Sequence, residues 1–175
     1  QHSVPVLYKQ TSFQIQQSLK ALKKITLIGV QVIITYPNND IGGKLIIKEI
    51  KKLSKHKNIF IFKSLGSETY HGILSLSKKG KNIICAGNSS SGIKETAVFG
   101  CPTLNIGSRQ KNRMRGKNVI DSNNNSHEIY KKLLKYLFNK KFIKICKNTN
   151  NPYGGGTAGK KIVNYINRIK ASKEK

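Results

Sequence analysis

The chain has 175 residues, a length that suits one domain built around one hydrophobic core. Its 33 lysines and arginines against 7 acidic residues give a formal net charge of +26. The basic residues recur along almost every segment, so a solvated basic surface is favoured over a specific nucleic-acid-binding face. No apolar run approaches the roughly 18 residues of a membrane span and no signal peptide opens the chain, so we expect a cytoplasmic protein with no membrane partner.

The first half of the chain alternates between helical and strand patterns. Apolar residues at helical spacing predict a helix at 12–24. A run of β-branched residues predicts a strand at 30–36, which ends at Pro37 because the chain must turn there. The same patterns predict three further elements: a helix at 43–53, a strand at 58–62 and a helix at 68–76.

After a turn at 78–81, a short apolar run leads into a loop of small polar residues. Residues 83–86 predict a strand buried on both faces, and Gly-Asn-Ser-Ser-Ser-Gly at 87–92 predicts a tight turn into a helix at 93–99. Such a turn leaves backbone N–H groups free beside several hydroxyls and the positive end of the helix dipole. It is a seat for a phosphate group, although the same kind of turn also caps helices that bind no ligand.

Charged residues follow this turn. Glu95 is predicted in the first turn of the helix, where a carboxylate suits the dipole and can accept hydrogen bonds from vicinal hydroxyls such as those of a ribose. The next predicted strand, at 100–107, leads into Arg109, Arg113 and Arg115. We therefore expect three arginines to reach the place where an anion would sit, with Arg109 foremost because it directly follows the strand.

The last third of the chain is predicted to be helical after a short edge strand. This strand covers 118–120, and amphipathic patterns predict the helices 127–138, 142–146 and 157–169. Pro152 and three consecutive glycines form an elbow before the last helix, which is most simply a solvent-facing helix. Residues 171–175 are expected to be disordered.

The cysteines and His71 are interpreted as structural or surface residues. Cys85 and Cys101 fall inside predicted strands, and Cys146 is far from both, so small buried side chains are favoured over nucleophiles, disulfides or metal ligands. His71 is most simply a surface residue of the helix at 68–76. No cluster with metal-ligand spacing is present in the sequence, so we expect no metal site.

Alternating strands and helices predict a parallel sheet with right-handed crossovers and helices on both faces. This is a Rossmann-like α/β fold, which we expect as one domain over residues 1–175. Ligands in such folds bind where the strands end, which places the 87–92 turn and Asn38 near the same edge. A plain turn with Asp40 as the cap of the next helix is the alternative for the residues after Pro37.

Four segments together resemble one enzyme family. They are TYPNND at 35–40, GNSSSGIKE at 87–95, FGCPTLNIGSRQKNRMRGKNVID at 99–121 and NPYGGGTA at 151–158. This set is similar to the hydrolysing UDP-N-acetylglucosamine 2-epimerases of sialic-acid and related nonulosonic-acid biosynthesis. In that family the matching residues lie in the carboxy-terminal domain of a two-domain, glycosyltransferase-B-like enzyme and hold the UDP moiety. The resemblance also implies that the last helix, after the elbow at Pro152, crosses back toward the partner domain.

The resemblance implies a set of UDP-binding residues. They are His2, Asn38, Ser64, Leu65, Ser89, Ser90, Glu95 and Arg109. The family pattern implies that the two serines and Arg109 hold the diphosphate, that Glu95 holds the ribose, and that the backbone around Ser64 and Leu65 cradles the uracil.

Two positions depart from the family pattern. Ser3 replaces the proline that usually follows the histidine, and Asn39 stands where a small apolar residue is common. On its own, a lone histidine at a chain end such as His2 would be inert. The resemblance instead implies that His2 contacts the phosphates at the domain cleft.

The resemblance also implies a reaction and its partners. A proton leaves C2 of the sugar while UDP departs from C1, and water then adds to give N-acetylmannosamine. The acid and base belong to the amino-terminal domain, so we expect this chain, a fragment or excised domain, to be inactive alone, with His2 as the one catalytic candidate. No cofactor is implied. The implied partners are a UDP-sugar, the amino-terminal domain and, in the complete enzyme, further copies of itself.

Other functions remain open from the sequence. A UDP-sugar-dependent glycosyltransferase or a non-hydrolysing epimerase shares the architecture, although GNSSSG and RQKNRMR favour the hydrolysing branch. A non-catalytic, basic domain that binds nucleotides or nucleic acid is the alternative from another class. Strongly salt-dependent DNA or RNA binding that ignores UDP would support that alternative.

Overall fold

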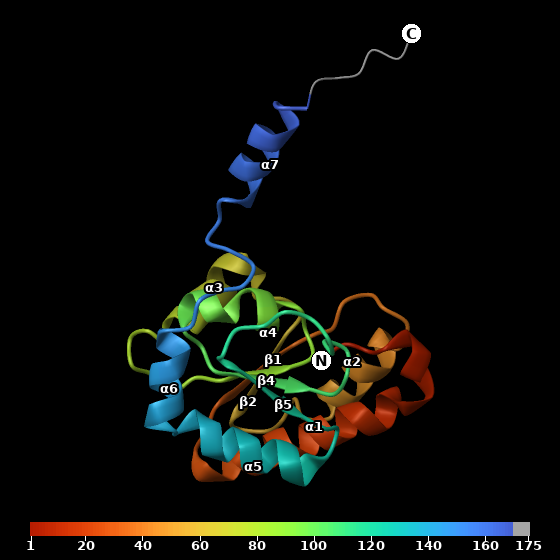
Figure 1. Ribbon diagram of the computed structural model, residues 1–175. Helices are drawn as coiled ribbons and strands as arrows, with labels where there is room; N and C mark the ends of the chain where they lie inside the picture. Colours follow the sequence, from red (N-terminus) through yellow and green to blue (C-terminus); the bar gives the residue numbers. More distant parts are fainter. Residues whose placement is uncertain (170–175) are drawn as a thin grey trace.

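A computed structural model describes residues 1–169, so the expectation for 171–175 lies outside the described part (Figure 1). The strands are β1 (Val32–Thr35), β2 (Ile59–Phe62), β3 (Cys85–Gly87), β4 (Thr103–Ile106) and β5 (Val119–Ser122). The α-helices are α1 (Thr11–Ile25), α2 (Gly43–Lys51), α3 (Gly66–Ser75), α4 (Ser91–Lys94), α5 (Ser126–Leu137), α6 (Lys140–Lys147) and α7 (Ala158–Ile166). The 3-10 turns are η1 (Pro5–Gln10), η2 (Thr26–Ile28) and η3 (Thr96–Phe99).

The strands pair in parallel, which confirms the predicted α/β alternation. β1 pairs with β2, from Val32 opposite Ile59 to Thr35 opposite Phe62. β4 lies between β3 and β5. The structure therefore holds two parallel sheets instead of one continuous sheet, and a cavity separates β1 from β3.

One hydrophobic core serves both sheets. α1 packs against α2 and α5, and its buried Ile15, Leu19 and Ile25 follow helical spacing. These side chains join residues of β1, β2, β4, α2 and α5 in a single cluster. β4 is buried along its whole length, as a strand covered on both faces must be. The shared core holds the two sheets together.

The helix predicted at 93–99 differs from the structure. It begins earlier, as the one-turn α4, and continues only as the 3-10 turn η3. The Thr96 hydroxyl donates a hydrogen bond to the Gly92 carbonyl at 2.7 Å, and it accepts hydrogen bonds from Thr103 and Asn118. A threonine hydroxyl that bonds back to the preceding turn bends a helix. Glu95 consequently lies at the end of α4 and not in the first turn of a long helix.

β3 is less buried than the sequence predicts. Its residues are half-buried or exposed, although the apolar pattern of 83–86 favours a strand buried on both faces. β3 is an edge strand of its sheet, and its residues Ala86 and Gly87 line the neighbouring cavity.

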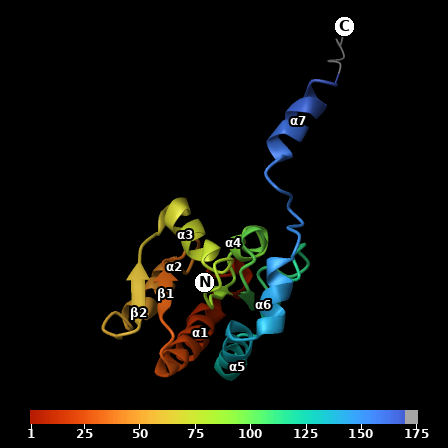
Figure 2. The same cartoon turned by 90° about the vertical axis from the view of Figure 1, so that its left-hand side faces the viewer.

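The last helix stands away from the packed body. Figures 1 and 2 show α7 extending beyond α3 and α6 at the end of an irregular segment. Its apolar residues are exposed: Ile162, Val163, Tyr165 and Ile166. This exposure fits both interpretations of the last helix, solvent-facing or crossing to a partner domain, and both stay predictions.

Candidate functional site

The loops that follow four strands carry most of the residues predicted to bind a ligand. Asn38 follows β1, Ser64 and Leu65 follow β2, Ser89 follows β3 and Arg109 follows β4. Parallel strands end at the same edge, where open α/β folds bind their ligands. The four loops form two adjoining regions at this edge.

The first region is an open pocket of about 310 Å³, which we call the Tyr70 pocket. Its lining residues are Thr35, Tyr36, Lys63, Ser64, Leu65, Gly66, Ser67, Tyr70, Ser91 and Glu95. The volume lies near the lower end of the range for small-molecule sites. Ser64, Leu65 and Glu95 were predicted as ligand contacts, and the fold brings them to one pocket although β3 separates them in the chain.

Tyr70 and Ser91 are members of this pocket that sequence reasoning missed. The Tyr70 hydroxyl donates to Oγ of Ser91 at 3.1 Å, and that hydroxyl donates to Oγ of Ser89 at 3.2 Å. Burial raises the pKa of the Tyr70 phenol well above its usual value, so Tyr70 stays a neutral donor. This chain of hydroxyls links the Tyr70 pocket to the serine loop at residues 87–92. The sequence signal for Ser91 was the run of serines that follows a predicted strand.

Glu95 has a partner that the sequence did not reveal. Its Oε2 lies 2.8 Å from Nε2 of His71 on α3, and both side chains are about two-fifths exposed. The His71 ring also packs on Phe99, with 5.1 Å between ring centroids. The prediction of His71 as a plain surface residue is therefore incomplete, because its imidazole orients the Glu95 carboxylate.

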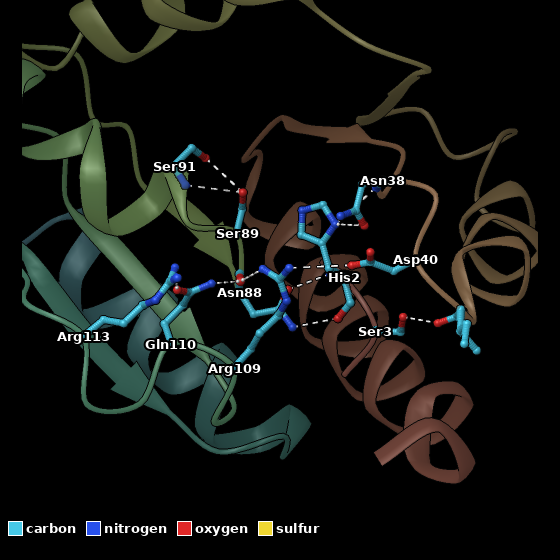
Figure 3. Close-up of polar contacts among 11 residues, drawn as sticks. His2, Ser3, Asn38, Asp40, Asn88, Ser89, Ser91, Arg109, Gln110 and Arg113 are labelled. Atoms are coloured by element: carbon cyan, nitrogen blue, oxygen red, sulfur yellow. Dashed lines mark hydrogen bonds and ion pairs between the residues drawn. The ribbon is translucent and has the colours of Figure 1, made fainter. Parts of the chain in front are cut away.

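The second region, the His2 cluster, consists of His2, Asn38, Asp40, Asn88 and Arg109 (Figure 3). Nδ1 of His2 lies 2.7 Å from the side-chain oxygen of Asn38 and 3.2 Å from its backbone nitrogen. Burial is the main cause that lowers the pKa of His2, so the neutral ring is favoured near pH 7. The predicted pair His2 and Asn38 thus lies together in space.

Asn88 joins the parts of the His2 cluster. It is 2% exposed, its side chain accepts from the His2 backbone N–H at 2.6 Å, and it donates to the His2 carbonyl at 2.7 Å. Its own carbonyl accepts from Arg109 at 3.1 Å and from the buried Gln110 at 2.8 Å. Sequence reasoning missed Asn88 and Gln110; Asn88 directly follows β3, and this position of a polar residue was its sequence signal.

Arg109 is the arginine that reaches the site. Its Nη2 lies 3.6 Å from Oδ2 of Asp40, and about a quarter of the side chain is exposed. Of the other two arginines, Arg113 donates to Gln110 and Arg115 pairs with Asp121. The expectation that all three arginines reach the anion stays a prediction.

Asp40 is not the cap of α2, because Gly42 occupies that position and the Asp40 carboxylate faces Arg109. The plain-turn alternative is therefore wrong for the side chain of Asp40. Its backbone carbonyl does close the turn, by accepting from Gly43 at 2.8 Å.

Ser89 and Ser90 lie at the start of α4, between the two regions. Ser90 precedes the helix, and its carbonyl accepts from Ile93 and Lys94. Within residues 1–169, the backbone N–H groups of Ser89 and Ser90 donate to no protein acceptor. A one-turn helix has little macrodipole, so an anion here would rely on these N–H groups, the hydroxyls and Arg109.

Other chemistry finds little support in the described part of the chain. Within residues 1–169, no three His, Cys, Asp or Glu side chains gather where a metal ion could be held. Over the same range, no helix combines the length and apolar character needed to cross a membrane. Burial raises the pKa of the Cys101 thiol, and raises that of Cys146 to about 12, which fits unreactive buried residues.

Comparison with known proteins gives a consistent family match. A family model described as UDP-N-acetylglucosamine 2-epimerase matches residues 5–167. The GDP/UDP-N,N'-diacetylbacillosamine 2-epimerase (hydrolyzing) of Campylobacter jejuni is 41% identical over 136 residues, 75% of this chain and 33% of that protein. The UDP-N,N'-diacetylbacillosamine 2-epimerase (hydrolyzing) of Legionella pneumophila is 34% identical over 166 residues, 94% of this chain and 41% of that protein. The chain spans about a third to two fifths of the length of these curated relatives.

The fold also matches solved structures. A co-structure of S. aureus MnaA with UDP gives a TM-score of 0.70 at 17% sequence identity, and the match covers 96% of this chain and 44% of that one. At this level of identity the likeness concerns the fold. It confirms the expected Rossmann-like architecture, which resembles one half of a glycosyltransferase-B-like enzyme.

Proposed function

Because the chain belongs to the UDP-N-acetylglucosamine 2-epimerase family, we propose that it is the UDP-binding half of a hydrolysing UDP-N-acetylglucosamine 2-epimerase. The observation that carries this proposal is the Tyr70 pocket, where Ser64, Leu65 and Glu95 meet beside the free N–H groups of Ser89 and Ser90. The names of the relatives from Campylobacter and Legionella support the hydrolysing reaction.

The Tyr70 pocket suits the nucleoside end of UDP, and the neighbouring His2 cluster suits the diphosphate end. We place the uracil beside Ser64 and Leu65 and the ribose hydroxyls on the Glu95 carboxylate, within a pocket that holds a nucleoside better than a whole nucleotide sugar. The diphosphate then reaches the N–H groups of Ser89 and Ser90, with the Arg109 guanidinium beside them. His2 and Asn38 lie at the far side of the phosphates, where the sugar would begin.

In the proposed reaction this half assists the departure of UDP. Base-assisted loss of the C2 proton, with cleavage of the C1–O bond, gives a glycal and UDP, and addition of water gives N-acetylmannosamine. Negative charge grows on the diphosphate as the C1–O bond breaks, and Arg109 together with preorganised N–H donors stabilises it without a metal. The acid and base lie outside this chain, with His2 as the one candidate within it.

The remaining partners follow from the same proposal. The amino-terminal domain of the enzyme would close the sugar side of the cleft, and the exposed apolar side of α7 offers it a contact surface. The complete enzyme would be a cytoplasmic homo-oligomer that supplies N-acetylmannosamine for sialic or related nonulosonic acids.

The proposal is tested by separating binding from turnover. Residues 1–175 should bind UDP at one site by calorimetric titration, weakly, because no second domain closes over the ligand. The same protein mixed with UDP-N-acetylglucosamine should release no UDP above the uncatalysed rate. Turnover by this chain would contradict the assignment of the acid and base to another domain, and the absence of UDP binding would contradict the whole proposal.

His71 is predicted to tune the ribose contact through Glu95. His71→Phe keeps an aromatic ring on Phe99 but removes the nitrogen 2.8 Å from the carboxylate, so Glu95 becomes free to turn into solvent. Loss of one such hydrogen bond costs roughly 0.5–1.5 kcal/mol, so UDP affinity should fall about 2- to 10-fold. A matched titration with 2′-deoxy-UDP should show a smaller loss, and equal losses for both ligands would place the effect of His71 away from the ribose.

A further inference from the structure

Four side chains form a continuous hydrogen-bonded path that ends at the serine loop. It runs from Cys85 of β3 through Tyr70 of α3 to Ser91, the first residue of α4, and then to Ser89. The Tyr70 oxygen lies 3.8 Å from the sulfur of Cys85 and 3.1 Å from Oγ of Ser91. Oγ of Ser91 lies 3.2 Å from Oγ of Ser89 (Figure 3). We call these four residues the Tyr70 network.

The Tyr70 end of the network gives it a direction. Burial is the main cause that raises the pKa of the Tyr70 phenol, so the hydroxyl keeps its single hydrogen. A phenol is a better donor and a poorer acceptor than an aliphatic alcohol, so this hydrogen goes to Ser91. Burial also raises the pKa of the Cys85 thiol, which keeps its S–H and can donate to the Tyr70 oxygen.

The other end of the network leaves Ser89 with only a hydrogen to offer. Oγ of Ser89 accepts from the Ser91 hydroxyl at 3.2 Å and from the Ser91 backbone N–H at 3.4 Å. A serine oxygen has two acceptor lone pairs and one hydrogen, so both lone pairs are engaged. Among residues 1–169, the Ser89 hydroxyl donates to no protein acceptor. The network therefore fixes Ser89 as a donor with a free hydrogen.

A hydroxyl fixed as a donor suits an anionic ligand. The oxygens of an ionised phosphate accept hydrogen bonds and donate none, and charge-assisted bonds of this kind are stronger than neutral ones. A serine without such neighbours rotates and accepts as readily as it donates, so it must be oriented when the phosphate binds. Here the orientation exists beforehand, and successive hydrogen bonds polarise one another, which strengthens the last donor.

We propose that Tyr70 is a positioning residue for the phosphate contact, because through Ser91 it fixes the hydroxyl of Ser89 as a donor to the diphosphate. This inference rests on the proposed function, since it needs a diphosphate beside the serine loop. Tyr70 does not itself touch the phosphate in this arrangement. It acts from the Tyr70 pocket, where the nucleoside is placed.

The network also joins the two ends of the proposed ligand site. Tyr70 lies on α3, which begins at Gly66, directly after the loop that holds Ser64 and Leu65. Ser89 lies in the loop after β3, on the phosphate side. The hydroxyl of Tyr70 should therefore matter for ligands that carry phosphate, although its ring lies on the nucleoside side.

A single substitution separates the hydroxyl from the ring. Tyr70→Phe keeps the ring in the pocket and removes only the hydroxyl, so the affinity of residues 1–175 for UDP should fall about 3- to 10-fold in calorimetric titration. Uridine lacks phosphate and should bind the wild type and Tyr70→Phe equally. Tyr165→Phe removes the same group from an exposed position on α7 and should change neither affinity. Equal losses for UDP and uridine would overturn the proposal, because Tyr70 would then serve the nucleoside.

A double-mutant cycle tests whether Tyr70 acts through the serines. Ser91→Ala interrupts the same network at its middle and should weaken UDP binding about as much as Tyr70→Phe. In a Ser89→Ala background the last donor is absent, so Tyr70→Phe should cause no further loss of UDP affinity. Losses that multiply independently in the double variant would overturn the proposal, because Tyr70 would then reach the ligand by another route.

The same titrations distinguish failure of this inference from failure of the proposed function. If the wild type binds no UDP, both are wrong. If it binds UDP and Tyr70→Phe binds UDP equally well, only the role of Tyr70 is wrong. Thermal unfolding of each variant shows that it is folded, and Ser91→Ala decides the matter if Tyr70→Phe does not fold.

Discussion

Replacement of Arg109 by alanine is expected to weaken UDP binding roughly 10- to 100-fold. A guanidinium that holds a phosphate makes charge-assisted hydrogen bonds worth about 1.5–3 kcal/mol, and each 1.4 kcal/mol is about tenfold in affinity. The structure makes this substitution informative, because the Asn88 carbonyl keeps Gln110 as a donor at 2.8 Å when Arg109 is removed. The serine loop therefore retains an anchor, and the loss reports mainly on the ligand.

Three controls separate the phosphate contact from other roles of Arg109. Uridine lacks phosphate and should bind the wild type and Arg109→Ala equally. Arg109→Lys should recover only part of the affinity, because an ammonium keeps the charge but loses the planar fork. Asp40→Asn removes the ion partner and leaves Arg109 in place, so UDP affinity should hold or rise. Calorimetric titration decides the matter, and a uridine loss as large as the UDP loss would mean that Arg109 only shapes the loop.

Replacement of Asn88 by alanine is expected to give the largest loss of stability. It leaves the backbone N–H and C=O of His2 without their side-chain partners, and each unsatisfied buried group costs roughly 1–3 kcal/mol. Thermal unfolding of a domain of this size shifts by about 2–4 °C per kcal/mol, so the loss of both partners should lower the melting temperature by roughly 4–24 °C.

A matched substitution tests whether burial is the reason. Asn164→Ala removes the same amide from an exposed position on α7 and should leave the melting temperature nearly unchanged. Asn88→Asp keeps an acceptor for the His2 N–H but sets an oxygen against the His2 carbonyl, so it should destabilise as well. A melting temperature of Asn88→Ala within about 1 °C of the wild type would mean that the main chain of His2 contributes nothing to the fold.

Local sequence patterns determined most of the secondary structure. The spacing of apolar residues predicted the positions of helices α1, α2, α3 and α5, and of all the strands, to within a few residues. These patterns succeed because helix and strand periodicity depends on near neighbours in the chain. The Gly-Asn-Ser-Ser-Ser-Gly turn and the polar residues after each strand likewise marked the edge where the loops gather.

Tertiary contacts decided the details of the site. The Thr96 hydroxyl meets Thr103 of β4 and Asn118, the residue before β5, which shortens α4 and moves Glu95 to its end. The pairing of Glu95 with His71 on α3 arises because α3 packs against η3, the 3-10 turn that follows Glu95. No local pattern encodes such a partner.

The arginines and the strand pairing show the same division between what the sequence determines and what only the tertiary structure decides. By itself, the sequence determined a parallel α/β fold, the family resemblance and a ligand edge built from several loops. Only the tertiary structure showed that Arg109 faces Asp40 while Arg115 turns to Asp121, and that Asn88 binds His2. It alone also showed the cavity between β1 and β3, since pairing between strands depends on segments far apart in the chain, whose meeting the local pattern of each strand does not specify.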